Sequence, residues 1–111
     1  MMAAQKRIEA IRTIYNNAMY NEPRDLAAAQ TPAQVTAIQE NVAKARTIYF
    51  AAIADGLTAN GDDVEEAYAL AVEAEKTVRK ARDSSSAVTD LLNKLRTATS
   101  AAGNLLQKAS H

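Results

Sequence analysis

The chain has 111 residues with 13 basic and 13 acidic side chains, and it contains no cysteine. This length suits one ordinary domain, because two separate cores would each bury too little surface. The balanced charge argues against a nucleic-acid partner or an anionic membrane partner, and the missing cysteines exclude disulfides and thiol chemistry. We therefore expect a single helical-bundle domain over residues 1–111.

The first nine residues lack the apolar segment of a signal peptide, and no apolar run is long enough to span a bilayer. These features predict a cytoplasmic location and leave export by a signal-independent route open. The single histidine, His111, is the last residue, so it cannot anchor a site that needs several histidine ligands. We expect no metal site and no cofactor.

Four segments of the chain share one pattern, in which apolar or small residues recur at alternating intervals of three and four. This spacing is typical of amphipathic helices that pack against other helices. It predicts helices over residues 3–20, 32–54, 63–82 and 86–108, joined by short antiparallel connections. The predicted fold class is therefore all-α, an up-and-down antiparallel helical bundle of four helices.

The first two helices are separated by residues 21–25, where Pro23 would remove a hydrogen bond from a continuous helix. Residues 26–30 could add one further helical turn after this break. The next helix has a strong start, because Thr31 can cap it and Gln34 can complete a capping box.

Residues 55–62 contain two of the three glycines and predict the second connection. The third connection, at residues 83–86, contains serines but neither glycine nor proline. We favour a break with a serine cap there. The alternative is one continuous helix over residues 62–108 in a three-helix fold, which would require a dimer or larger assembly to cover its distal half.

The predicted core is poor in large side chains, since the chain has 25 alanines but only 21 leucine, isoleucine, valine and phenylalanine residues together. Alanine contributes little transfer free energy, so either the helices approach closely over alanine faces or a partner completes the core. The expected core residues are Ile8, Ile11, Tyr15, Val35, Ile38, Val42, Tyr49, Val64, Ala71, Val78, Val88, Leu91, Leu95 and Leu105.

The tetrapeptide Arg-Thr-Ile-Tyr occurs at residues 12–15 and again at residues 46–49. The separation of 34 residues is the tetratricopeptide period, but each such repeat contains two helices and here 34 residues contain roughly one. We interpret the repeated tetrapeptide as belonging to two helices that pack in the same way. The tyrosines then occupy equivalent positions in the apolar stripe, and the arginines lie beside it.

Six residues are candidates for an interaction site, and two interpretations of the aromatic ones stand side by side. The favoured one makes them core aromatics whose hydroxyls reach the surface, and the other makes them an exposed hot spot for a partner. The candidates are Tyr15, Tyr49, Phe50, Tyr68, Arg12 and Arg46.

No catalytic triad, zinc-ligand set or glycine-rich phosphate loop is recognisable in the sequence. We therefore predict a non-enzymatic helical protein-interaction module that self-assembles as a homo-oligomer or acts as an adaptor or chaperone for another helical protein. The alternative is a small-molecule-binding bundle or enzyme whose Arg7, Arg12, Arg46 and Lys44 clamp a dicarboxylate or phosphate. The basic run at residues 79–82 is interpreted as a helix C-terminus that complements the helix dipole.

Overall fold

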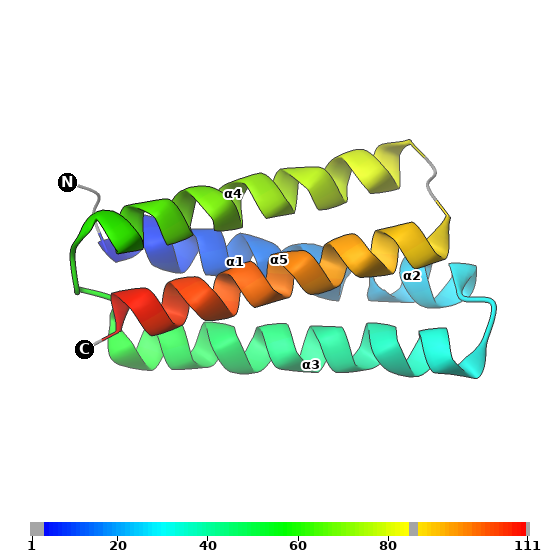
Figure 1. Ribbon diagram of the computed structural model, residues 1–111. Coiled ribbons are helices and arrows are strands. Elements are labelled where there is room, and N and C mark those ends of the chain that lie inside the picture. The colour runs from blue at the N-terminus through cyan, green and yellow to red at the C-terminus, as the bar shows by residue number, and fades with distance from the viewer. Residues whose placement is uncertain (1–3, 85–86, 111) are drawn as a thin grey trace.

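The computed structural model describes residues 4–84 and 87–110, which form helices and no strand. The helices pack side by side into a body of 42 × 24 × 17 Å (Figure 1). The predicted all-α helical bundle is confirmed, and the four long helices begin and end close to their predicted bounds. The helices are α1 (Ala4–Tyr20), α2 (Glu22–Ala28), α3 (Pro32–Asp55), α4 (Asp62–Asp83) and α5 (Val88–Ala109).

The short helix α2 corrects the prediction of a break over residues 21–25. The break narrows to Asn21, and Pro23 lies in the first turn of α2, where a backbone N–H has no acceptor within the helix. The predicted cap of α3 is confirmed, since the Thr31 side chain accepts from the N–H of Gln34 at 3.1 Å. The capping box is displaced by one residue, because the Gln34 side chain accepts from the N–H of Gln30 at 2.7 Å.

The favoured break between the last two helices is confirmed, and a single helix over residues 62–108 is wrong. Helix α4 ends at Asp83 and α5 begins at Val88, with Ala87 rather than a serine at its N-cap. Residues 85 and 86, where the last helix was predicted to begin, lie outside the described residues. Helices α4 and α5 pack against each other as antiparallel neighbours, so each covers the other within one chain (Figure 1).

The direction of the long helices alternates along the chain, but their order in space does not follow the chain. Helices α3 and α4 lie on opposite sides of the α1·α5 pair (Figure 1). As a result α3 and α5 are neighbours that run parallel. Their register is shown by Gln34, which donates to Thr89 at 3.4 Å, and by Ile48, which lies against Gly103.

The connection between α3 and α4 must therefore cross the end of the bundle. Helix α3 ends at Asp55 and is capped by Gly56, which adopts the left-handed conformation with φ of 88°. Leu57 follows with φ of 52° and turns its side chain completely into the core. On the far side, the N–H of Ala59 donates to the carbonyl of Ala109 at the end of α5, at 3.0 Å.

Arg7 holds this connection from the other side, although it was predicted as a candidate ligand-binding cation. Its side chain is 1% exposed, and Nη1 donates to the carbonyls of Leu57 and Ala59, at 2.6 Å each. Nη2 donates to the side-chain oxygen of Asn60 at 2.7 Å. The guanidinium thus satisfies backbone acceptors that the crossing brings into the protein, and its role is structural.

Most of the predicted core is confirmed, with three corrections. Ile8 and Tyr49 are half-buried because they pack at the edge of the main cluster, and Val35 is half-buried in the first turn of α3. The confirmed core residues are Ile11, Tyr15, Ile38, Val42, Val64, Ala71, Val78, Val88, Leu91, Leu95 and Leu105. Further buried residues that were not predicted include Ile14, Ala18, Ala45, Ile48, Ala52, Leu57, Ala67, Leu92, Ala98, Ala102 and Ala109.

We expect Arg7→Met to lower the free energy of unfolding by about 2–4 kcal/mol, because it leaves buried carbonyl groups without a donor. Urea unfolding followed by circular dichroism measures the change. Lys6→Met is the matched control, since Lys6 is exposed on the preceding position of the same helix, and it should change stability by less than about 0.5 kcal/mol. Equal stabilities for the two variants would contradict the role assigned to Arg7.

Candidate functional site

The two Arg-Thr-Ile-Tyr segments face each other across the antiparallel pair of α1 and α3. Arg12 Nε donates to the Tyr49 hydroxyl at 3.1 Å, and Arg46 Nε donates to the Tyr15 hydroxyl at 3.3 Å. The hydrogen bond to Tyr15 is the main cause that raises the pKa of Arg46 above its ordinary value. The repeated tetrapeptide is therefore explained by reciprocal contacts between two antiparallel helices.

These contacts surround a cluster of three aromatic rings. The Tyr15 and Tyr49 rings stack with centroids 5.6 Å apart, and the Phe50 ring lies 5.8 Å from Tyr49 and 6.5 Å from Tyr15. Each guanidinium carbon, of Arg12 over Tyr49 and of Arg46 over Tyr15, is 5.9 Å from the ring centroid, within cation–π range. We call these five residues the aromatic–arginine surface.

The structure thus brings together five of the six predicted interaction residues. Some of the aromatic ones fit the interpretation as core residues, and others fit the interpretation as an exposed surface. Tyr15 is a core aromatic and Tyr49 is half-buried, whereas Phe50 is 57% exposed. Tyr68 is separate from them, because it lies on α4 and lines a groove of about 230 Å³ together with residues of α1. Arg12 and Arg46 are exposed and contact tyrosines on the outer surface, which does not favour a clamp built from this pair.

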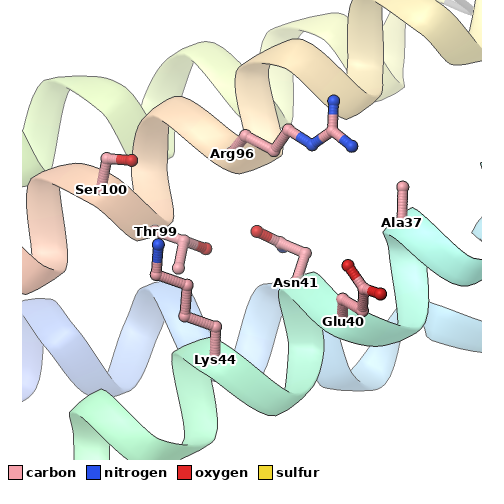
Figure 2. Close-up of a pocket in the computed structure, with 7 residues that line it drawn as sticks. All are labelled: Ala37, Glu40, Asn41, Lys44, Arg96, Thr99 and Ser100. Carbon is pink, nitrogen blue, oxygen red and sulfur yellow. The ribbon is translucent and has the colours of Figure 1, made fainter.

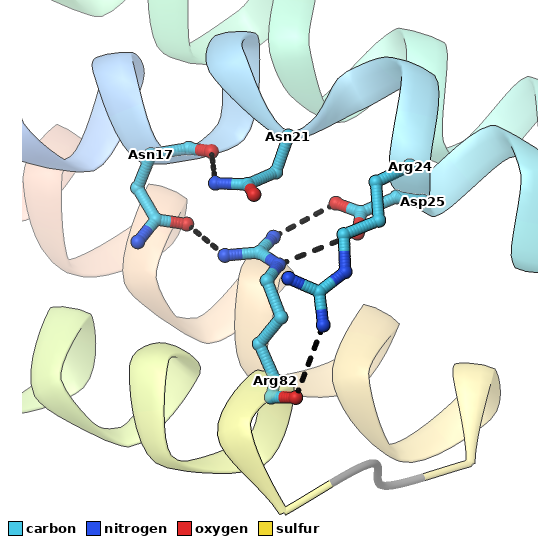
Figure 3. A network of polar contacts seen from close by, with 5 residues as sticks. All are labelled: Asn17, Asn21, Arg24, Asp25 and Arg82. Atoms are coloured by element: carbon cyan, nitrogen blue, oxygen red, sulfur yellow. Dashed lines mark hydrogen bonds and ion pairs between the residues drawn. The ribbon is translucent and has the colours of Figure 1, made fainter.

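A buried ion pair that the sequence did not predict joins Asp25 of α2 to Arg82 near the end of α4 (Figure 3). Arg82 donates through Nη2 to Asp25 at 2.8 Å, and both side chains are at least nine-tenths buried. The Arg82 guanidinium also donates to the Asn17 side chain, and Arg24 donates to the Arg82 carbonyl at 3.5 Å. The network joins α1, α2 and α4, which explains why the seven-residue helix α2 is held in place.

The charged side chains near the end of α4 are not all exposed. Arg82 points inward, and Arg79 pairs with Glu75 at 2.9 Å, so the basic run at residues 79–82 is not a continuous cationic face. Glu75 itself is 6% exposed. The pair of Asp25 and Arg82 could not be recognised from the sequence. The two residues are separated by 57 positions, and only the fold brings them together.

A second unpredicted feature is a cleft of about 290 Å³ between the parallel neighbours α3 and α5 (Figure 2). Asn41 is 6% exposed and Thr99 is 1% exposed, yet Asn41 Nδ2 and Thr99 Oγ1 have no hydrogen-bond partner among the described residues. The residues that line the cleft are Ala37, Glu40, Asn41, Lys44, Arg96, Thr99 and Ser100.

The sequence contained one signal for this cleft. Thr99 lies four residues after Leu95 on the apolar stripe of α5, where a polar residue interrupts the pattern. Asn41 lies directly before Val42 of the α3 stripe and gave no comparable signal. Lys44 was predicted as a candidate cation, and it does line the cleft, but without Arg7, Arg12 or Arg46.

Comparison with known proteins finds no match to a protein-family model, to a curated protein or to a solved structure. In residues 4–84 and 87–110, no three or more acidic or histidine side chains gather in a way that could hold a metal ion. None of the helices in that part of the chain combines the length and the apolar character needed to cross a bilayer.

We expect Arg82→Met to lower the free energy of unfolding by about 3–5 kcal/mol, because Asp25 would remain buried without its counter-charge. Chemical denaturation monitored by circular dichroism gives the value. Lys80→Met, at an exposed position two residues earlier in the same helix, is the matched control and should be nearly neutral. If both variants unfold at the same denaturant concentration, the buried pair does not hold the bundle as described.

Proposed function

We propose that this protein is a non-enzymatic helical interaction module that binds a partner protein through the aromatic–arginine surface. The observation that carries the proposal is the exposed side of the ring cluster on α3. Phe50 is 57% exposed, and Ile53, one turn later on the same helix, is 51% exposed. An exposed phenylalanine beside an exposed isoleucine gives a partner apolar area to bury.

The composition of this surface supports the proposal. Aromatic residues and arginine are the residue types most enriched at the energetic centres of protein interfaces. Here the rings pack against one another, and both arginines are held by tyrosine hydroxyls. Side chains that are already ordered lose less conformational entropy when a partner binds, which raises affinity for a given contact area.

Charge indicates the chemistry of the partner. Arg12 and Arg46 flank the rings from two helices, so the surface presents two cations around an apolar centre. A partner that places acidic side chains beside apolar ones, as an acidic amphipathic helix does, complements this arrangement. A second copy of the chain would bring two pairs of arginines together, which opposes self-association through this surface.

We expect the double variant Phe50→Ala/Ile53→Ala to weaken partner binding at least about tenfold while the protein stays folded. Affinity purification from the native source with the wild type identifies the partner, and titration calorimetry with the purified partner measures the loss. Leu70→Ala is the matched control, because Leu70 is 54% exposed on α4, away from the surface.

Three outcomes decide this experiment. Binding that is lost in the double variant and retained in Leu70→Ala supports the proposal. Binding that survives in both variants contradicts the assigned surface. If sedimentation velocity shows a dimer of the wild type that dissociates in the double variant, the partner at this surface is a second copy of the chain rather than a different protein.

A further inference from the structure

The connection between α3 and α4 contains the one asparagine of the chain that precedes a glycine, in the pair Asn60–Gly61. Both residues are exposed and lie outside the helices, at the end of the bundle that carries the C-terminus (Figure 1). Glycine has no side chain to crowd its main-chain nitrogen, so this nitrogen can approach the side chain of the preceding residue. An asparagine in such a pair is chemically labile, because that nitrogen can attack its side-chain amide.

The main-chain nitrogen of Gly61 is available for this attack. No described residue accepts a hydrogen bond from the Gly61 N–H. The same connection contains Asp55–Gly56, a second pair that can form a ring of this kind, but there the Gly56 N–H donates to the carbonyl of Ala52 at 2.9 Å. The structure thus distinguishes the two pairs, and it leaves Asn60–Gly61 as the one with an unoccupied nucleophile.

The other asparagines are less open to the reaction. Asn21 precedes Glu22, whose side chain crowds the attacking nitrogen. The rest lie inside helices, where the N–H of the following residue donates to a carbonyl one turn earlier and is held away from the amide. These residues are Asn16, Asn17, Asn41, Asn93 and Asn104.

Arg7 contacts the oxygen of the labile amide. Its Nη2 donates to Asn60 Oδ1 at 2.7 Å, while Nη1 is held by the carbonyls of Leu57 and Ala59. A cationic donor on an amide oxygen draws electrons from the carbon and stabilises the oxyanion that forms when a nucleophile adds. The same donor favours a carboxylate over an amide at position 60, because hydrogen bonds between charged groups are stronger than those to neutral ones.

We propose that Asn60 is a site of spontaneous deamidation and that the resulting carboxylate pairs with Arg7. The Gly61 nitrogen gives up its proton and bonds to Asn60 Cγ, the bond from Cγ to Nδ2 breaks, and ammonia leaves behind a succinimide ring. Water then opens the ring, either at Cγ to give aspartate or at the main-chain carbonyl carbon to give isoaspartate. Over the two steps, the amide and one water become a carboxylate and an ammonium ion.

The modification has two physical consequences. It adds one negative charge to a chain whose net charge is zero, so the modified and unmodified chains differ in net charge. In the aspartate product it also replaces a hydrogen bond to a neutral amide with an ion pair, at a contact that holds the α3–α4 connection. The site goes beyond the proposed protein-binding function and shares no residue with the aromatic–arginine surface, so either proposal can fail without the other.

The first experiment follows the purified full chain during storage in mildly alkaline buffer, which favours loss of the Gly61 amide proton. Anion-exchange chromatography should resolve a growing species with one more negative charge, and peptide mass spectrometry should place the change at Asn60. Asn60→Gln is the matched control, since it keeps an amide but would have to close a larger ring, and the growing species should be lost. A chain that stays unmodified at Asn60, or that is modified mainly at another asparagine, overturns the site.

The second experiment tests the pairing with Arg7 in the variant Asn60→Asp, which carries the aspartate product from the start. We expect a melting temperature about 4 °C above that of the wild type, because a charged acceptor replaces a neutral one beside Arg7. In carbon-detected NMR the new carboxyl group should titrate at least one pH unit below the ordinary value of about 3.9. It should also titrate below Asp63, which lies in the first turn of α4 and experiences the same helix dipole. An unchanged or lower melting temperature, or a midpoint equal to that of Asp63, overturns the pairing.

Discussion

The arrangement of this bundle depends on the hydrogen bonds that Arg7 donates to the connection between α3 and α4. A chain that crosses the end of a bundle brings backbone carbonyl groups out of water, and those groups must find donors. Arg7 supplies them from α1, and the crossing places α4 on the far side of the α1·α5 pair. The parallel contact between α3 and α5, and with it the cleft, follows from this crossing.

Two buried arginines close the bundle at opposite ends. Arg7 holds the α3–α4 connection, and Arg82 holds α2 through Asp25. Between them the helices pack through alanines, several of which are completely buried, together with a smaller number of large aliphatic side chains. The polar ends add directional contacts that small apolar side chains do not provide.

Helix α3 contributes residues to two surfaces, because its side chains lie against different neighbouring helices. Arg46, Tyr49 and Phe50 meet α1 and form the aromatic–arginine surface. Asn41 and Lys44 meet the neighbouring α5 and line the cleft. One surface is aromatic and partly exposed, whereas the other is a polar cleft of about 290 Å³.

The sequence by itself determined the four long helices, their approximate ends, the Thr31 cap and most of the apolar core, because these depend on residue spacing within a few turns. It also indicated that the residues of the repeated tetrapeptide occupy equivalent places. Only the tertiary structure decided which helices are neighbours. The partners of Arg7 and Arg82, and the meeting of Asn41 with Thr99, depend on pairs more than 49 positions apart. Such pairs leave no local pattern. A buried arginine and an exposed arginine can occupy the same position in a helical repeat, and they differ only in the residues that the fold places beside them.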